Sequence, residues 1–224
     1  MTRTNIKLAL TLCLGTVALM AQTTAASVTA TGTSTIYVQP DQAQLNISVT
    51  TFGATATAAG QQNANVTVAV TKAITGVLGS NGSIQTISYS VYPQYGTGAQ
   101  SSTIAGYSAT NSFQVTMTDL TLIGSIIDTA NQAGATSVGN LTLSLQNPAP
   151  SLLQALTAAS KVGLANAGAI AAGLGRSAGS VISAQQSSAV TPIVAGVVSA
   201  AATTSVQTGP VSVSATVTVT AQLQ

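Results

Sequence analysis

Histidine and tryptophan are absent from this chain of 224 residues, and cysteine occurs only once. Only 4% of the residues are charged, whereas an average soluble domain has about 25%. A metal site needs imidazole, thiolate or clustered carboxylate ligands, and the three carboxylates here lie far apart in sequence, at Asp41, Asp119 and Asp128. A serine nucleophile needs a base, and neither Lys72 nor Lys161 follows a serine by three residues. We therefore expect no enzyme activity, no metal and no cofactor.

Residues 1–26 have the pattern of a secretory signal peptide. Basic residues open the segment, an apolar run extends from Leu8 to Leu19, and small residues fill 21–26. The apolar run is too short for a bilayer span, which takes about 20 residues. We therefore predict that residues 1–26, which include Cys13, are removed on export; a retained membrane anchor is the alternative. The remaining chain, 27–224, has the length of one domain and no transmembrane span, and it has no cysteine to form a disulfide.

The predicted mature chain is electrically neutral, with three lysine or arginine side chains against three aspartates. No basic patch is present to neutralise phosphates, so no nucleic-acid partner is expected. The apolar content is high and periodic, which is typical of a folded chain rather than a disordered one. Its surface must therefore consist mainly of Thr, Ser, Gln and Asn. Because few groups titrate, we also expect similar stability in acidic and neutral media.

Alternation of apolar and polar residues predicts most of the strands. Two alternating runs flank Pro40-Asp41 between Val28 and Thr50, and proline followed by aspartate is typical of a turn, so we predict a hairpin there. A second hairpin is predicted from strands at 84–95 and 104–117, joined by a Gly/Ser-rich connection. The remaining strands are predicted at 138–145, 181–184 and 211–223.

Helical spacing of apolar residues predicts three helices. The region 52–78 also has strand-like alternation, but its length and the following Gly79 favour a helix. Asp119 is predicted to cap a short amphipathic helix that ends at Gly134, and Ser151 to cap a long helix over 152–174. The predicted buried stripes are, for the first helix, Ala59, Val66, Ala69, Ala73 and Val77, and for the long helix, Leu153, Leu156, Ser160, Leu164, Ala167, Ala171 and Leu174. The many Ala and Gly residues of the long helix should let another element approach it closely.

Four tyrosines fall in the second predicted hairpin, at Tyr89, Tyr92, Tyr95 and Tyr107. One interpretation is an aromatic contact surface for a partner or for self-assembly. The other is cross-strand packing with the hydroxyl groups at the rim of the sheet. A further apolar segment, Ala189–Ala202, contains Pro192 and Gly196 and is predicted to be either an oligomer or membrane-surface contact or a loop folded over the core.

Several short motifs occur in an order that resembles the SIMPL-domain family of exported bacterial proteins. They are Pro40-Asp41-Gln42-Ala43, Ile84-Gln85-Thr86, Gly106-Tyr107 and Asp119-Leu120. Together with the residue patterns, this resemblance predicts an α+β fold of two packed lobes, with mostly antiparallel strands and long amphipathic helices on one face. The chain departs from the family at Gln154, Val162 and Leu164, where relatives usually carry charges, so recognition of a partner by charge is not expected.

The resemblance implies a non-catalytic cell-envelope protein that forms a homo-oligomer in the periplasm and has a role in envelope or oxidative stress tolerance. The sequence identifies no small-molecule ligand, and peripheral association with the envelope is an open expectation. The alternative is a secreted surface or matrix protein, or antigen, with no stress role, favoured by the uncharged Thr/Ser-rich composition. An outer-membrane barrel is a third possibility, and the long predicted helices argue against it.

Overall fold

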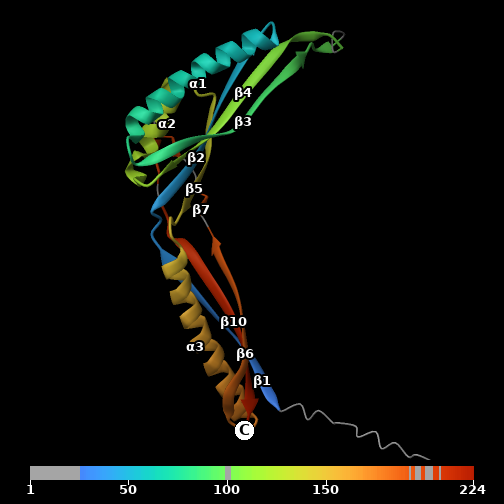
Figure 1. The fold of residues 1–224 in the computed structure, drawn as a ribbon, viewed down its shortest axis with the longest axis vertical. Coiled ribbons are helices and arrows are strands. Elements are labelled where there is room, and N and C mark those ends of the chain that lie inside the picture. Colours follow the sequence, from blue (N-terminus) through green and yellow to red (C-terminus); the bar gives the residue numbers. More distant parts are fainter. Residues whose placement is uncertain (1–25, 99–101, 192, 195–197, 200–203, 207) are drawn as a thin grey trace, which may run out of the picture.

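The computed structural model describes residues 26–98, 102–191, 193–194, 198–199, 204–206 and 208–224. The predicted signal peptide and Cys13 lie outside these residues, apart from Ala26. The molecule is an elongated, curved body with one sheet at each end; helices follow its convex side and strands its concave side (Figure 1). Each sheet is antiparallel and has its helices packed on one face only, which confirms the predicted α+β fold.

The lower sheet contains three strands in the order β1-β10-β6. These strands are β1 (Ser27–Val38), β10 (Val211–Leu223) and β6 (Ala178–Thr191). One long helix, α3 (Ala149–Gly173), packs on the sheet. The alternation of β10 buries Val211, Val213, Ala215, Val217 and Val219 on one face, as predicted. The strand predicted at 181–184 is part of the much longer β6.

The upper sheet contains five strands in the order β3-β4-β2-β5-β7. These strands are β3 (Gly82–Tyr95), β4 (Ile104–Met117), β2 (Gln42–Gly53), β5 (Ser137–Ser144) and β7 (Ile193–Val194). The helices on this sheet are α1 (Ala56–Leu78) and α2 (Ile123–Gln132), the latter preceded by the 3-10 turn η2 (Leu120–Leu122). A short ladder of β8 (Val198–Ser199) and β9 (Thr204–Ser205) completes the described elements.

The hairpin predicted between Val28 and Thr50 is wrong. The two strands exist, but β1 pairs with β10 in the lower sheet, whereas β2 pairs with β4 and β5 in the upper sheet. The Asp41 carboxylate accepts a hydrogen bond of 2.6 Å from the backbone N–H of Gln146, and the Asp41 N–H donates to the Ser144 carbonyl oxygen at 3.2 Å. These bonds hold the connection against the chain between β5 and α3, so it links the lobes instead of folding β2 back onto β1.

The second predicted hairpin is confirmed, because β3 and β4 pair along their length. The apolar segment Ala189–Ala202 begins in β6 and continues into β7, where Val194 pairs with Thr142 of β5. The chain therefore crosses from the lower sheet to the edge of the upper one. Both predictions for Ala189–Ala202 can be compared with the structure only at its start, where Ala189 is exposed and Val190 packs half-buried against the lower core; the side chains of 192–202 are outside the described part of the chain.

Helix α1 confirms the helical interpretation of its ambiguous segment. The Thr55 hydroxyl accepts a hydrogen bond from the Ala58 N–H at 3.1 Å, and Gly79 ends the helix with a φ of 55°. The predicted stripe is partly wrong, since Ala69 is exposed. The buried residues of α1 are Ala59, Asn63, Val70, Ile74 and Leu78. The face that carries the largest aliphatic side chains is the one that packs on the sheet.

Helices α2 and α3 begin differently from each other. The Asp119 carboxylate accepts a hydrogen bond from the Thr121 N–H at 3.0 Å, so the predicted cap exists, but it caps the 3-10 turn η2 that leads into α2. Helix α2 itself has no side-chain cap. Ser151 is not the cap of α3, because the helix starts at Ala149, whose N–H donates to the Asn147 side chain at 3.1 Å. Pro148 and Pro150 fit this start, since the first turn needs no N–H from them.

The predicted buried stripe of α3 is partly wrong: Ala167 and Ala171 are buried and Leu156 and Ser160 are half-buried, but Leu153, Leu164 and Leu174 are exposed. Leu153 and Leu174 are 66% and 63% exposed. The buried residues of the helix are Ala155, Ala159, Gly163, Ala167 and Ala171. A Cβ atom on Gly32 of β1 would overlap the backbone of Ala159 and Gly163. Beside Gly32 the helix therefore lies too close to the sheet for a large side chain, as the expected close approach of small residues implied.

Candidate functional site

Both sheets leave one face without a helix, and hydroxyl groups fill it in the lower sheet. Residues paired across antiparallel strands point to the same face. Thr29 and Thr31 pair with Thr220 and Thr218, and their hydroxyl oxygens lie 3.0 and 3.1 Å apart. Ser187 of β6 extends the next row along the same face. The lower sheet therefore presents an array of hydroxyl groups opposite to α3.

The helix-free face of the upper sheet has the same chemistry. The hydroxyl oxygens of Ser48 and Ser112 lie 2.8 Å apart, and those of Thr50 and Thr110 lie 3.0 Å apart. The Gln114 amide donates to the Asn46 side-chain oxygen at 3.4 Å in the next row. This face therefore presents uncharged hydrogen-bond donors and acceptors.

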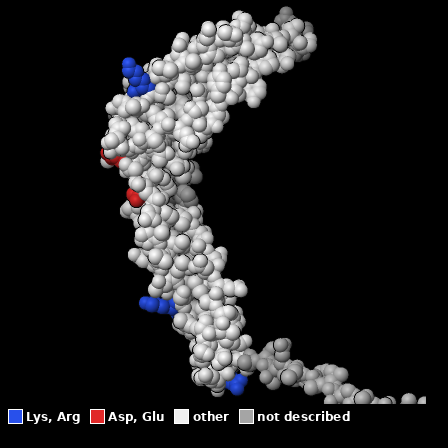
Figure 2. Space-filling model, viewed as in Figure 1, with Lys and Arg blue, Asp and Glu red and all other residues white. Residues whose placement is uncertain are grey.

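No described strand carries a charged side chain. The charged residues lie on helices or connections, at Asp41, Lys72, Asp119, Asp128, Lys161 and Arg176. Figure 2 shows the coloured side chains along the convex edge and at the lower end, while the concave edge is white. The charges and the helix-free sheet faces therefore occupy different parts of the surface.

The structure does not bring the four tyrosines of the second hairpin into one cluster. Tyr89 and Tyr107 pair with Asn111 and Pro93 and share the helix side of the sheet. A Cβ atom on Gly60 of α1 would lie 3.1 Å from the Tyr89 hydroxyl oxygen. Tyr92 points to the opposite face, and Tyr95 follows a register shift at the strand end.

Phe52 is an exposed aromatic residue that sequence reasoning missed. It pairs with Ser108, which also pairs with Tyr92, so the two rings share one row on the helix-free face. Phe52 is 66% and Tyr92 64% exposed. Its position in the sequence could have revealed it, because Phe52 falls on the polar side of an alternating strand, the side that also carries Ser48 and Thr50.

The edges of the lower sheet differ in how they are covered. Helix α3 lies over β1 and β10, and the Asn166 amide donates to the Thr31 carbonyl oxygen on β1 at 2.9 Å. In the described part of the chain, no strand pairs with the outer edge of β6. A hollow of about 290 Å³ lies between α3 and β6, with Leu156 and Ser160 on one side and Ala184 and Gln186 on the other. The helix-facing side of β6 is therefore uncovered.

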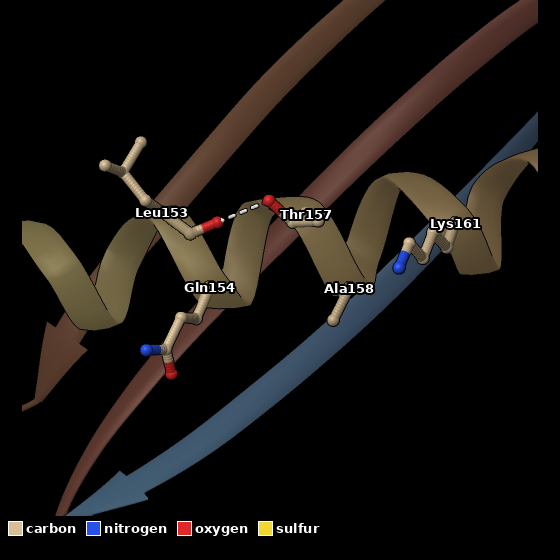
Figure 3. Close-up of a pocket in the computed structure, with 5 residues that line it drawn as sticks. All are labelled: Leu153, Gln154, Thr157, Ala158 and Lys161. Atoms are coloured by element: carbon tan, nitrogen blue, oxygen red, sulfur yellow. Dashed lines mark hydrogen bonds between the residues drawn. The ribbon is translucent and has the colours of Figure 1, made fainter.

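A second hollow, of about 390 Å³, lies on the outer side of α3 (Figure 3). Its lining residues all come from this one helix: Leu153, Gln154, Thr157, Ala158 and Lys161. The Thr157 hydroxyl already donates to the Leu153 carbonyl oxygen at 2.8 Å. No second element closes the hollow, so it has the form of a shallow surface groove.

Comparison with protein families identifies the chain. A family model named SIMPL, described as a protein of unknown function (DUF541), matches residues 28–221. The chain belongs to the SIMPL family. Comparison with curated proteins gave no match.

Among its described residues, the SIMPL chain has no group of three or more His, Cys, Asp or Glu residues that could hold a metal ion. Over the same residues, none of the helices combines the length and the apolar character that crossing a bilayer requires. The described surface of the chain offers neutral sheet faces, an exposed aromatic row and the unpaired edge of β6.

Proposed function

We propose that this SIMPL chain is a non-catalytic exported protein that works as a homo-oligomer in the periplasm and contributes to envelope or oxidative stress tolerance. The observation that carries the proposal is the free edge of β6. It is unpaired in the described structure, it has no charged residue or proline, and its pairing with β10 has no register shift from Ser183 to Thr191. A long, flat edge of this kind is a template for another strand.

The edge of β3 is protected in ways that β6 is not. Pro93 removes a donor from β3, and a register shift at Thr86–Ser88 disrupts its regular pairing. Helix α1 also packs against one side of β3, at Tyr89. The outer edge of β1 is also unpaired in the described structure, but the Asn166 amide of α3 already binds its Thr31 carbonyl oxygen. We therefore assign the contact between copies to β6.

A second copy of the chain also suits the uncovered hollow beside β6. Val181 of β6 and Leu164 of α3 are 49% and 46% exposed, whereas Val217 beneath the hollow is 5% exposed. A partner strand paired with β6 would continue the sheet, and its side chains would cover this apolar surface. Backbone hydrogen bonds and apolar burial would then stabilise the same contact.

Export is proposed from the pattern of residues 1–26. The stress role is proposed from the family resemblance and from the residue types present in 27–224. Protection by redox cycling is disfavoured because 27–224 has no thiol and its only methionine, Met117, is 0% exposed. We infer that protection is indirect, through shielding or holding envelope components. A deletion strain should tolerate peroxide less well than its parent, and equal tolerance would remove the stress role.

Light scattering coupled to size exclusion on residues 27–224 tests the assembly. We expect a mass of several chains for the wild type and a monomer for Gln186→Lys/Ser188→Lys, which places two like charges on the uncovered side of β6. The matched control, Gln154→Lys/Thr157→Lys, adds the same charge to the outer side of α3 and should remain assembled. A monomeric wild type would contradict the proposal, and an assembled β6 variant would contradict the assigned edge.

The alternative is a secreted surface or matrix protein without a stress role. It is supported by the uncharged hydroxyl arrays of both sheets. Cell fractionation separates the two, because the proposal expects the protein in a periplasmic extract. Recovery mainly from the culture medium or from the cell surface would favour the alternative.

A further inference from the structure

The exposed aromatic row of the upper sheet is distinct from the edge assigned to assembly. Phe52 lies on β2 and Tyr92 on β3, with Ser108 of β4 between them. Neighbouring strands are about 4.8 Å apart, so the two positions are separated by about 10 Å. The rings project from the face opposite to α1 and are each about two-thirds exposed. Two large exposed rings thus stand on this face, next to its hydroxyl pairs.

The surroundings of this row are polar and uncharged. The next rows along the face contain the hydroxyl pairs Thr50–Thr110 and Ser48–Ser112. In each pair one hydroxyl donates to the other, so the pair still has one donor and several acceptor lone pairs to offer. A hollow of about 400 Å³ adjoins Phe52 and is also lined by the Gln94 side chain. The face therefore combines rings with neutral hydrogen-bonding groups.

We propose that this face binds an extended neutral polysaccharide through the flat sides of its sugar rings. A pyranose ring has apolar C–H faces and hydroxyl groups around its rim, which match an aromatic platform flanked by hydroxyls and amides. The distance between the rings is of the order of a disaccharide, so they can contact alternate sugars of an extended chain. The absence of charge on every described strand suits a neutral polymer and gives a polyanion nothing to pair with. This inference goes beyond the proposed function.

Affinity electrophoresis in native gels containing hydroxyethylcellulose, a neutral soluble β-glucan, tests the proposal with residues 27–224. We expect the polymer to retard the wild type, and Phe52→Ala or Tyr92→Ala to weaken binding about tenfold each. The matched control is Tyr89→Ala, because Tyr89 is 55% exposed on the same strand but points to the opposite face. It should be retarded as the wild type is, and thermal melting checks that every variant is folded.

Four results would overturn the proposal. One is a wild type that the neutral glucan does not retard, and another is Phe52→Ala and Tyr92→Ala variants that bind as the wild type does. A third is equal retardation by carboxymethylcellulose that salt abolishes, which would indicate binding by charge. The last is a Tyr92→Ala variant whose oligomer mass falls by light scattering, which would show that a second copy covers this face.

Discussion

The two lobes have the same plan but are packed in opposite ways. In the upper lobe, helices α1 and α2 and the sheet fill their interface with large side chains. Those with almost no exposure include Leu45, Ile47, Ile74, Phe113 and Ile126. In the lower lobe, the fully buried residues of α3 are alanines and one glycine; Leu152 and Leu156 pack half-buried against the core, while Leu153 and Leu164 are exposed. Interdigitated large side chains hold α1 and α2 on the upper sheet, whereas α3 is held by the close approach of its backbone to β1.

This difference determines how each lobe responds to mutation. The upper lobe gains stability from apolar area removed from water, so truncating its side chains is costly. The lower lobe buries smaller side chains, and its interface has no room beside Gly32, so adding atoms is costly there. The stability of the two lobes should therefore respond to opposite kinds of substitution.

The largest effect is expected in the upper lobe, at Phe113. Phe113→Ala removes a ring that is 0% exposed and leaves a cavity, which should lower the free energy of unfolding by about 4 kcal/mol. The chain offers a matched control in Phe52→Ala, which truncates an exposed ring and should change that energy by less than about 0.5 kcal/mol. Urea unfolding followed by circular dichroism measures both, and equal losses would contradict the assigned core.

The second effect belongs to the lower lobe, at Gly32. The Cβ of Gly32→Ala would overlap the backbone of Ala159 and Gly163, so α3 must shift and the lobe should lose about 2–3 kcal/mol. The control is Gly168→Ala on α3, which has open space around its Cβ and should gain up to about 1 kcal/mol from helix propensity. Should Gly32→Ala prove as stable as the wild type in urea, the close contact would be refuted.

A smaller effect tests a polar position within the upper core. The Asn63 amide donates to the carbonyl oxygens of Val49 and Ala109 at 2.8 and 2.9 Å, and the residue is 0% exposed. Asn63→Ala leaves these carbonyls without that donor and should cost about 2 kcal/mol. Asn65→Ala, at an exposed position of the same helix, should be nearly neutral. Thermal melting that ranked the two variants equally would argue against the buried role of Asn63.

The smallest expected effect is that of pH, and it applies to both lobes. Residues 27–224 contain three carboxylates, all outside the strands and outside the buried cores. Acid unfolding requires carboxylates to gain protons, and so few side chains here can do so that denaturant midpoints at about pH 3 and pH 7 should nearly coincide. A gross difference between the two midpoints would mean that one of the aspartates contributes much more to folding than its position indicates.

Much of the fold could be predicted from the residues, because alternation and helical spacing are local. Strand β10, the second hairpin and the positions of the helices could be predicted from such patterns. The strand with which β1 pairs could not be predicted, because alternation does not indicate which neighbour a strand pairs with. Its pairing with β10 joins opposite ends of the chain, and only tertiary packing decides such a contact.

The buried faces of the helices were harder to predict than the helices themselves. On α3, leucines and alanines both recur at steps of three and four, so spacing alone favours the larger residues. The choice is made by the sheet, since the close approach at Gly32 brings the small residues of α3 into the interface. The candidate site was found in part, since the hairpin tyrosines were noted, but its row depends on Phe52, which only cross-strand register places beside Tyr92.

We infer that the chain acts through uncharged sheet surfaces, with the free edge of β6 as the contact between copies. Amide hydrogen exchange of β6 at increasing protein concentration tests this claim most directly, since an edge covered by a partner strand should become protected. We predict protection at Ser183–Thr191 that rises with concentration, while β10, already paired on both sides, stays unchanged. Rapid exchange along β6 that is the same at every concentration would contradict the account.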